Sequence, residues 1–105
     1  MLITNAFSMN MVSEFPVTIS VTEICIGAVI ADLHHSGVDS AVGHADTAAL
    51  FSEVIGMTIP VVRRTVSLGA GDNLIVGQYS GPRLPEDTTK LPEGAMIRWL
   101  FVEIK

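Results

Sequence analysis

The spacing of apolar residues predicts two short helices in the middle of the chain. Across residues 48–55, apolar side chains recur three and four positions apart, which gives a helix one buried face. Gly56 follows at once and predicts its end, because glycine adopts the left-handed conformation of a helix C-terminus at little cost. Residues 26–33 repeat the same spacing, and Gly37 predicts the end of that helix.

Alternating and continuous apolar runs predict the strands. The runs lie at residues 1–4, 17–21, 63–68, 73–79 and 95–104, the last of which carries Trp99 inside the sheet. Gly69-Ala-Gly-Asp72 predicts a turn that joins the third and fourth runs into a β-hairpin. Ser20 and Glu23 fit a capping box that starts the helix after them. This order predicts one α+β domain over residues 1–105, with a mixed sheet flanked by short helices.

Two further segments combine polar side chains with irregular structure. Residues 5–12 mix amides and hydroxyls with apolar residues, which is typical of a turn or a short helix. Residues 80–94 form a long proline-rich loop, and loops of this length in a compact domain are usually functional. The side chains that these segments offer are Asn5, Ser8, Asn10, Arg83 and Glu86. Their alternative role is to cap and turn the backbone.

Charge and cysteine content exclude several classes of function. The formal net charge is −5 with six Lys and Arg residues, too few to neutralise the phosphates of a long nucleic acid. The single cysteine, Cys25, permits neither an intrachain disulfide nor a cysteine-based zinc site. The N-terminus lacks a signal-peptide pattern, and the longest apolar run is too short to span a bilayer. We therefore expect a cytoplasmic protein without a membrane partner.

His44 is the most informative single residue, because it lies just ahead of the first turn of the helix that Gly56 ends. The first turn contains Asp46 and Thr47, and its free backbone N–H groups can bind a phosphate. A histidine at this point can transfer a proton to or from the bound anion. The alternative is that His44 is a capping or surface residue.

The remaining polar residues favour phosphodiester chemistry without a metal. No cluster of carboxylates or histidines has metal-ligand spacing, so we expect neither metal nor cofactor. In RNA-type cleavage, the substrate's 2′-OH attacks phosphorus, His44 protonates the leaving 5′-oxygen and Arg83 stabilises the phosphoryl oxygens. Glu86 either holds His44 protonated or accepts the 2′-OH proton. A solvated ion pair is the alternative for Arg83 and Glu86.

Three motifs in order resemble the viral ring nuclease family, the type III anti-CRISPR proteins and their cellular relatives. They are Asn5-Ala-Phe-Ser-Met-Asn-Met, Ser40-Ala-Val-Gly-His-Ala-Asp-Thr-Ala, and Gln78 followed by Gly81-Pro-Arg-Leu-Pro-Glu. The resemblance covers essentially the whole chain. Two departures are Asp46, where some relatives carry serine, and a spacing from Gln78 to Arg83 that is one residue longer than in the archaeal-virus members.

The resemblance implies a homodimer that binds cyclic tetra-adenylate and cleaves it, without metal, into linear di-adenylate with 2′,3′-cyclic phosphate ends. It implies that His44 is the general acid, that Arg83 and Glu86 complete the catalytic set, and that Ser8 contacts the ligand. With the polar residues noted above, the expected substrate-binding set is Asn5, Ser8, Asn10, Thr47 and Gln78.

Two other classes of function fit the same residues. One is a dimeric sponge that binds a cyclic nucleotide without cutting it, although His44 and Glu86 favour an enzyme over a sponge. The other is a small phage interaction protein whose polar residues only cap and turn the backbone. If the protein is viral, its site of action is the host cytoplasm.

Overall fold

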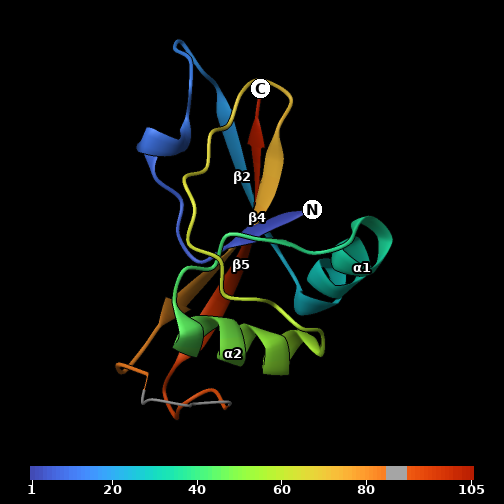
Figure 1. Cartoon of the computed structure of the whole chain (residues 1–105), viewed down its shortest axis with the longest axis vertical. Coiled ribbons are helices and arrows are strands. Elements are labelled where there is room, and N and C mark those ends of the chain that lie inside the picture. Colours follow the sequence, from blue (N-terminus) through green and yellow to red (C-terminus); the bar gives the residue numbers. More distant parts are fainter. Residues whose placement is uncertain (85–89) are drawn as a thin grey trace.

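The computed structural model describes residues 1–84 and 90–105, and it contains a mixed five-stranded sheet with helices packed on it (Figure 1). The strands are β1 (Leu2–Thr4), β2 (Ile19–Ile24), β3 (Asp39–Ser40), β4 (Asn73–Ser80) and β5 (Met96–Ile104). The helices are the 3-10 turn η1 (Met9–Met11), α1 (Ile26–Ser36) and α2 (Ala45–Ile55). The predicted α+β class is confirmed.

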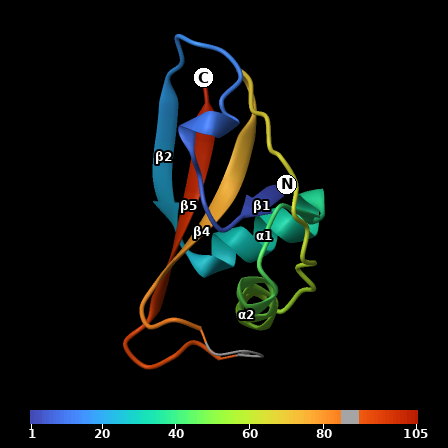
Figure 2. The ribbon, with the colours of Figure 1, turned by 60° about the vertical axis from the view of Figure 1, so that its left-hand side comes forward.

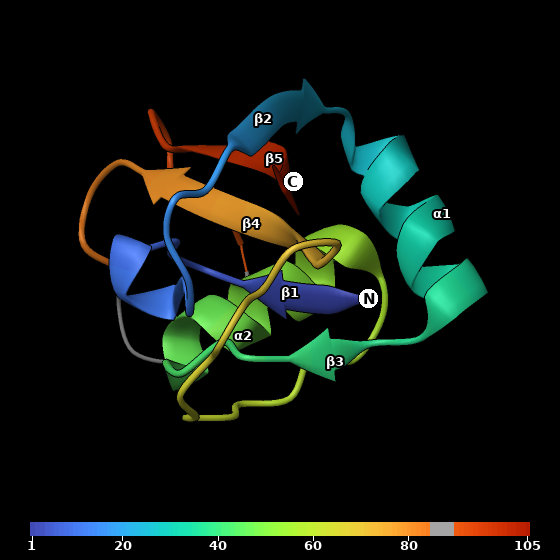
Figure 3. The same cartoon turned by 90° about the horizontal axis from the view of Figure 1, so that it is seen from above.

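The strand order is β2-β5-β4-β1-β3, and the sheet has a parallel and an antiparallel half. β1 runs parallel to both β3 and β4, whereas β5 runs antiparallel to both β4 and β2. Seen from above, β1 lies between β4 and β3 (Figure 3). The prediction that the strand carrying Trp99 lies inside the sheet is confirmed. The two-residue strand β3 was not predicted.

The predicted hairpin between residues 63–68 and 73–79 is wrong, although its turn is real. Asp72 N–H donates to the Gly69 carbonyl at 3.1 Å, and Gly69 N–H donates to Asp72 Oδ2 at 2.8 Å. β4, however, is flanked by β1 and by β5, so neither of its edges is open to residues 63–68. In the described structure those residues form only an isolated bridge from Leu68 to Val12.

The predicted capping box at Ser20 and Glu23 is also wrong, because both residues lie within β2. Ser20 pairs with Glu103, and Glu23 pairs with Leu100, across the antiparallel ladder to β5. The β-branched run favours a strand over a helix start. β2 therefore extends three residues beyond the predicted 17–21, and α1 begins only after Cys25.

α2 has the predicted limits. His44 is its N-cap, and Gly56 ends it with a φ of 78° in the left-handed region. Ala48, Leu50, Phe51 and Ile55 are buried as expected, while Val54 is 36% exposed, contrary to the predicted apolar face. The amphipathic pattern thus places one face of the helix on the sheet, and at its first turn His44 and Ala45 are exposed.

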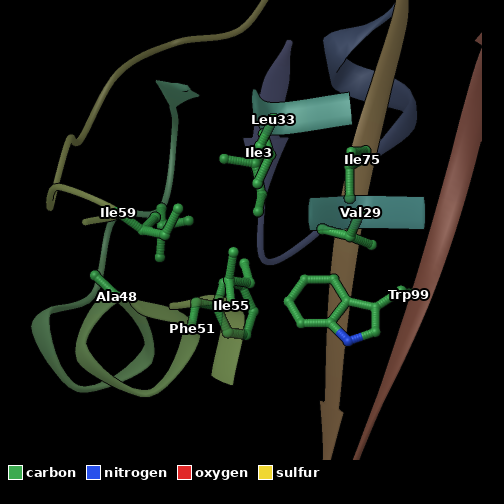
Figure 4. Packing of buried hydrophobic residues seen from close by; sticks show 10 residues of the cluster. Ile3, Val29, Leu33, Ala48, Phe51, Ile55, Ile59, Ile75 and Trp99 are labelled. Carbon is green, nitrogen blue, oxygen red and sulfur yellow. The ribbon is translucent and has the colours of Figure 1, made fainter. Parts of the chain in front are cut away.

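The core between α2 and the sheet centres on two aromatic rings. The ring centroids of Phe51 on α2 and Trp99 on β5 are 4.9 Å apart, and Figure 4 shows both side chains among buried aliphatic residues. Gly77 on β4 leaves room for them, since a Cβ there would lie 2.5 Å from Phe51 Cζ and 2.6 Å from Trp99 Cζ3. Glycine at this position therefore allows α2 to pack closely against β4 and β5.

The opposite face of the sheet carries a second apolar cluster. It contains Leu74, Val76, Val102 and Ile104, with Leu68 packed against them. Successive side chains of a strand point to opposite faces, so these even-numbered positions of β4 and β5 point away from the helices. Figures 1 and 3 show η1 and α1 on opposite sides of the sheet.

Within residues 1–84 and 90–105, the structure has no helix of the length and apolar character needed to cross a membrane.

Candidate functional site

His44 lies at the beginning of α2, and the helix does not use its side chain. The residue has an extended backbone, and its ring makes no capping hydrogen bond to the described residues. Its carbonyl accepts the first helical hydrogen bond, from Ala48 N–H at 2.9 Å. The N–H groups of the first turn therefore point out of the helix end beside an exposed imidazole, as an anion site requires.

A depression of about 500 Å³ brings His44 together with the segment that follows β4. Figure 1 shows the chain after β4 passing the end of α2 at which His44 lies. The depression is lined by His44, Asp46, Thr47, Tyr79, Gly81, Pro82, Arg83 and Leu84. Three predicted site residues, His44, Thr47 and Arg83, thus border one space, although they come from separate parts of the chain.

His44 also borders a second depression, of about 480 Å³. It is bordered by Asn5 from the N-terminal segment and by Arg63 and Arg64 from the extended segment after α2. Arg63 Nε donates a hydrogen bond to the Gly43 carbonyl at 3.0 Å, which fixes the guanidinium beside the start of α2. Arg64 forms an ion pair with Asp39 at 3.1 Å.

Arg63 and Arg64 were not predicted as site residues. They were assigned to a strand, where neighbouring side chains point to opposite faces, and no ligand was expected there. The usable signal was that these are the only two adjacent Lys or Arg residues in an acidic chain. Arg63, Arg64 and Arg83 are three of the six Lys and Arg residues, and all three border the two depressions that meet at His44.

A third depression of about 350 Å³ lies on the sheet face that points away from the helices. Apolar side chains from three strands line it, among them Val21, Val76 and Leu100. The predicted residues Asn5 and Gln78 supply carboxamides at its border. Gln78 is therefore not in the depression that holds His44 and Arg83, because it is one residue before Tyr79 and so points to the other face.

The structure does not bring Ser8 and Asn10 to these spaces. Within residues 1–84 and 90–105 they border none of the three depressions. Ser8 caps η1, since its Oγ accepts a hydrogen bond from Asn10 N–H at 3.1 Å. The capping role that the sequence offered as an alternative is the one observed for Ser8. The predicted catalytic residue Glu86 lies outside the described residues.

Among the described residues, no group of three or more His, Cys, Asp or Glu side chains is placed to hold a metal ion.

Comparisons with known proteins show that the chain is similar to a viral protein. The family model described as STIV B116-like matches residues 1–98. Among solved structures, B116 of Sulfolobus turreted icosahedral virus (STIV) is similar, with a TM-score of 0.83 and 26% sequence identity over 97% of each chain. No curated protein matches the sequence.

Proposed function

This chain belongs to the STIV B116-like family, and we propose that it is a metal-independent ring nuclease that cleaves cyclic tetra-adenylate. The products are linear di-adenylates with 2′,3′-cyclic phosphate ends, and their formation switches off type III CRISPR signalling. The observation that carries the proposal is the shared depression of His44 and Arg83, in which an imidazole and a guanidinium line the same space. Both groups are needed to cleave a phosphodiester without metal.

The chemical step transfers a phosphoryl group within the substrate. The 2′-oxygen forms a bond to phosphorus, the bond from phosphorus to the 5′-oxygen breaks, and His44 as imidazolium donates a proton to that leaving oxygen. Arg83, Arg63 and the N–H groups of the first turn of α2 stabilise the negative phosphoryl oxygens. The proton of the 2′-OH leaves to a base, for which Glu86 is a candidate; its other candidate role is to keep His44 protonated.

Recognition of adenine is assigned to the carboxamides. Asn5 and Gln78 border the apolar depression of about 350 Å³, and Asn5 also borders the depression beside His44. Carboxamides pair with the N6 and N7 edge of adenine, and apolar walls accept a flat base. A ligand that reaches from Asn5 to His44 would present its phosphate to the catalytic residues.

The proposal includes a homodimer. The sheet face that points away from the helices exposes apolar surface, and Val21 at its edge is 54% exposed. Pairing this face with a second copy, with the bound base held in the depression between them, would bury that surface and repeat the site about a two-fold axis. Two equivalent sites suit a cyclic ligand that has two-fold symmetry itself.

Incubation of the purified protein with cyclic tetra-adenylate in EDTA, followed by chromatography, tests the proposed function. The expected products carry 2′,3′-cyclic phosphate ends. A ring that co-elutes uncut with the protein would instead support the non-catalytic sponge. No binding at all would leave a small phage interaction protein, the second alternative.

A further inference from the structure

Tyr79 is the next-to-last residue of β4, and its hydroxyl closes a short loop of backbone. The hydroxyl donates a hydrogen bond to the carbonyl of Pro82, three residues later. Tyr79 also lines the depression that contains His44 and Arg83. A single side-chain bond therefore connects the end of the sheet to the segment that enters the candidate site.

The same segment is also close to the chain before β5, because Gly81 lies against Ala95. Gly81 has a φ of 148°, and a Cβ at this position would lie 2.8 Å from Ala95 Cα and 3.2 Å from Tyr79 Oη. The chain leaving β4 thus lies directly against the chain that enters β5. Only glycine permits this approach without displacing Ala95.

Pro82 and Arg83 share one peptide unit, so fixing the Pro82 carbonyl also fixes the plane that contains Arg83 N. Proline restricts the backbone further, because its own φ is set by the ring. With the carbonyl held by Tyr79 and Gly81 close to Ala95, the position of Arg83 Cα is set, and only its own φ and side-chain angles then orient the guanidinium. Arg83 itself is exposed and enters the depression from this anchored base.

We propose that Tyr79 is a positioning residue, whose hydroxyl holds the Pro82–Arg83 peptide unit so that the Arg83 guanidinium faces the same phosphate as His44. This role rests on the proposed ring cleavage. Tyr79 does not exchange a proton with the substrate, because its hydroxyl proton is engaged by the Pro82 carbonyl. It acts only through Arg83.

Tyr79→Phe tests this role, because it removes the hydroxyl and keeps the ring. We expect kcat for ring cleavage to fall about 10- to 100-fold, which is the usual effect of a small misplacement of a catalytic group, while KM changes much less. In an Arg83→Ala background the same substitution should have no further effect. An unchanged kcat in Tyr79→Phe, or an equal loss in both backgrounds, would overturn the proposal.

NMR relaxation of the backbone amides provides a readout that needs no activity. In Tyr79→Phe, the order parameters of the Gly81 and Arg83 amides should fall, while the urea midpoint of global unfolding stays unchanged. Unchanged order parameters would overturn the positioning role even in an active enzyme. If instead the wild-type protein leaves the ring uncut, the ring nuclease proposal fails, and the relaxation experiment still decides whether Tyr79 holds this segment.

Discussion

At the residue scale, His44 differs from a common helix N-cap in what its side chain does. Serine, threonine, asparagine and aspartate at this position accept hydrogen bonds from the first-turn N–H groups. The His44 ring makes no such bond to the described residues, so the N–H groups at the start of α2 remain available to an anion. The imidazole is then adjacent to that anion and free to exchange a proton with it.

Asp46 works against phosphate binding at this helix start. Its carboxylate lies in the first turn of α2 and lines the same depression as His44. We predict that Asp46→Asn binds cyclic tetra-adenylate about three- to ten-fold more tightly, because a repulsion between like charges disappears. The variant should also lose roughly 0.3–1 kcal/mol of unfolding free energy, since a negative charge near a helix N-terminus is favourable.

Glu53→Gln is the matched control for this substitution. Glu53 lies on the same helix and is exposed. It does not border the His44 depression but a separate one, near the C-terminal end of α2. Titration of a fluorescent ring analogue should show unchanged affinity for Glu53→Gln. An Asp46→Asn variant that binds no better than wild type would show that the carboxylate does not face the phosphate.

The site residues that could be predicted from sequence are those whose role depends on local structure. His44 and Thr47 follow from their place at a helix start, and the structure puts them where the pattern indicated. Arg63 could not be found in this way, because its approach to Gly43 depends on the path of the chain after α2. Gln78 and Tyr79 point to opposite faces of the sheet because they are neighbours on one strand. Which of the two points toward the helices likewise cannot be predicted without the orientation of that strand.

At the scale of elements, Gly77 determines how closely α2 approaches the sheet. Its missing side chain makes the space in which Phe51 and Trp99 pack. Because His44 begins the helix that carries Phe51, this contact also sets the distance of His44 from the end of β4. A larger residue at position 77 must displace at least one of the two rings.

We predict that Gly77→Ala lowers the free energy of unfolding by about 1–3 kcal/mol, the usual cost of overpacking a core. Gly27→Ala is the control. Gly27 lies in helix α1, and a Cβ there would meet only Cys25 Sγ at 3.8 Å. That variant should gain roughly 0.5–1 kcal/mol, because alanine is a better helix former. Urea denaturation of both variants measures the difference, and equal stabilities would contradict the packing role of Gly77.

The errors in predicted elements share one physical cause. Strand pairing is a long-range property, and periodicity within residues 63–68 cannot show that β1 and β5 already occupy both edges of β4. Ser20 and Glu23 matched a local capping rule, but pairing with β5 overrode it. Helix α2 was predicted correctly because its limits depend on neighbouring residues, namely the apolar spacing and Gly56.

At the scale of the whole molecule, the two faces of the sheet have different roles. The helices cover one face, and Figure 2 shows α2 end-on beside the strands β5 and β4. The other face keeps an apolar depression bordered by Asn5 and Gln78. In an acidic chain, three arginines border the two depressions at His44, although Asp39 pairs with Arg64 and Asp46 lines one of the depressions. The proposed adenine recognition and the proposed dimer contact both use the other face, so changes to its apolar side chains affect both.

We predict that Val21→Glu weakens the homodimer about ten-fold or more, because it introduces a charge into an apolar contact. Val54→Glu is the control, since Val54 is also exposed but lies on α2. Sedimentation equilibrium should show monomers for the first variant at concentrations where wild type and control are dimeric. Wild-type protein that is monomeric at all concentrations would contradict the proposed dimer.

The most direct test of the central claim, that His44 protonates the leaving oxygen, is single-turnover cleavage of a ring with sulfur in place of the bridging 5′-oxygen. A thiolate leaves without a proton. In EDTA, His44→Ala should cut the natural ring about 10²- to 10⁴-fold more slowly than wild type, yet cut the sulfur ring at nearly the wild-type rate. Equal loss on both rings, or no loss on the natural ring, would contradict the account.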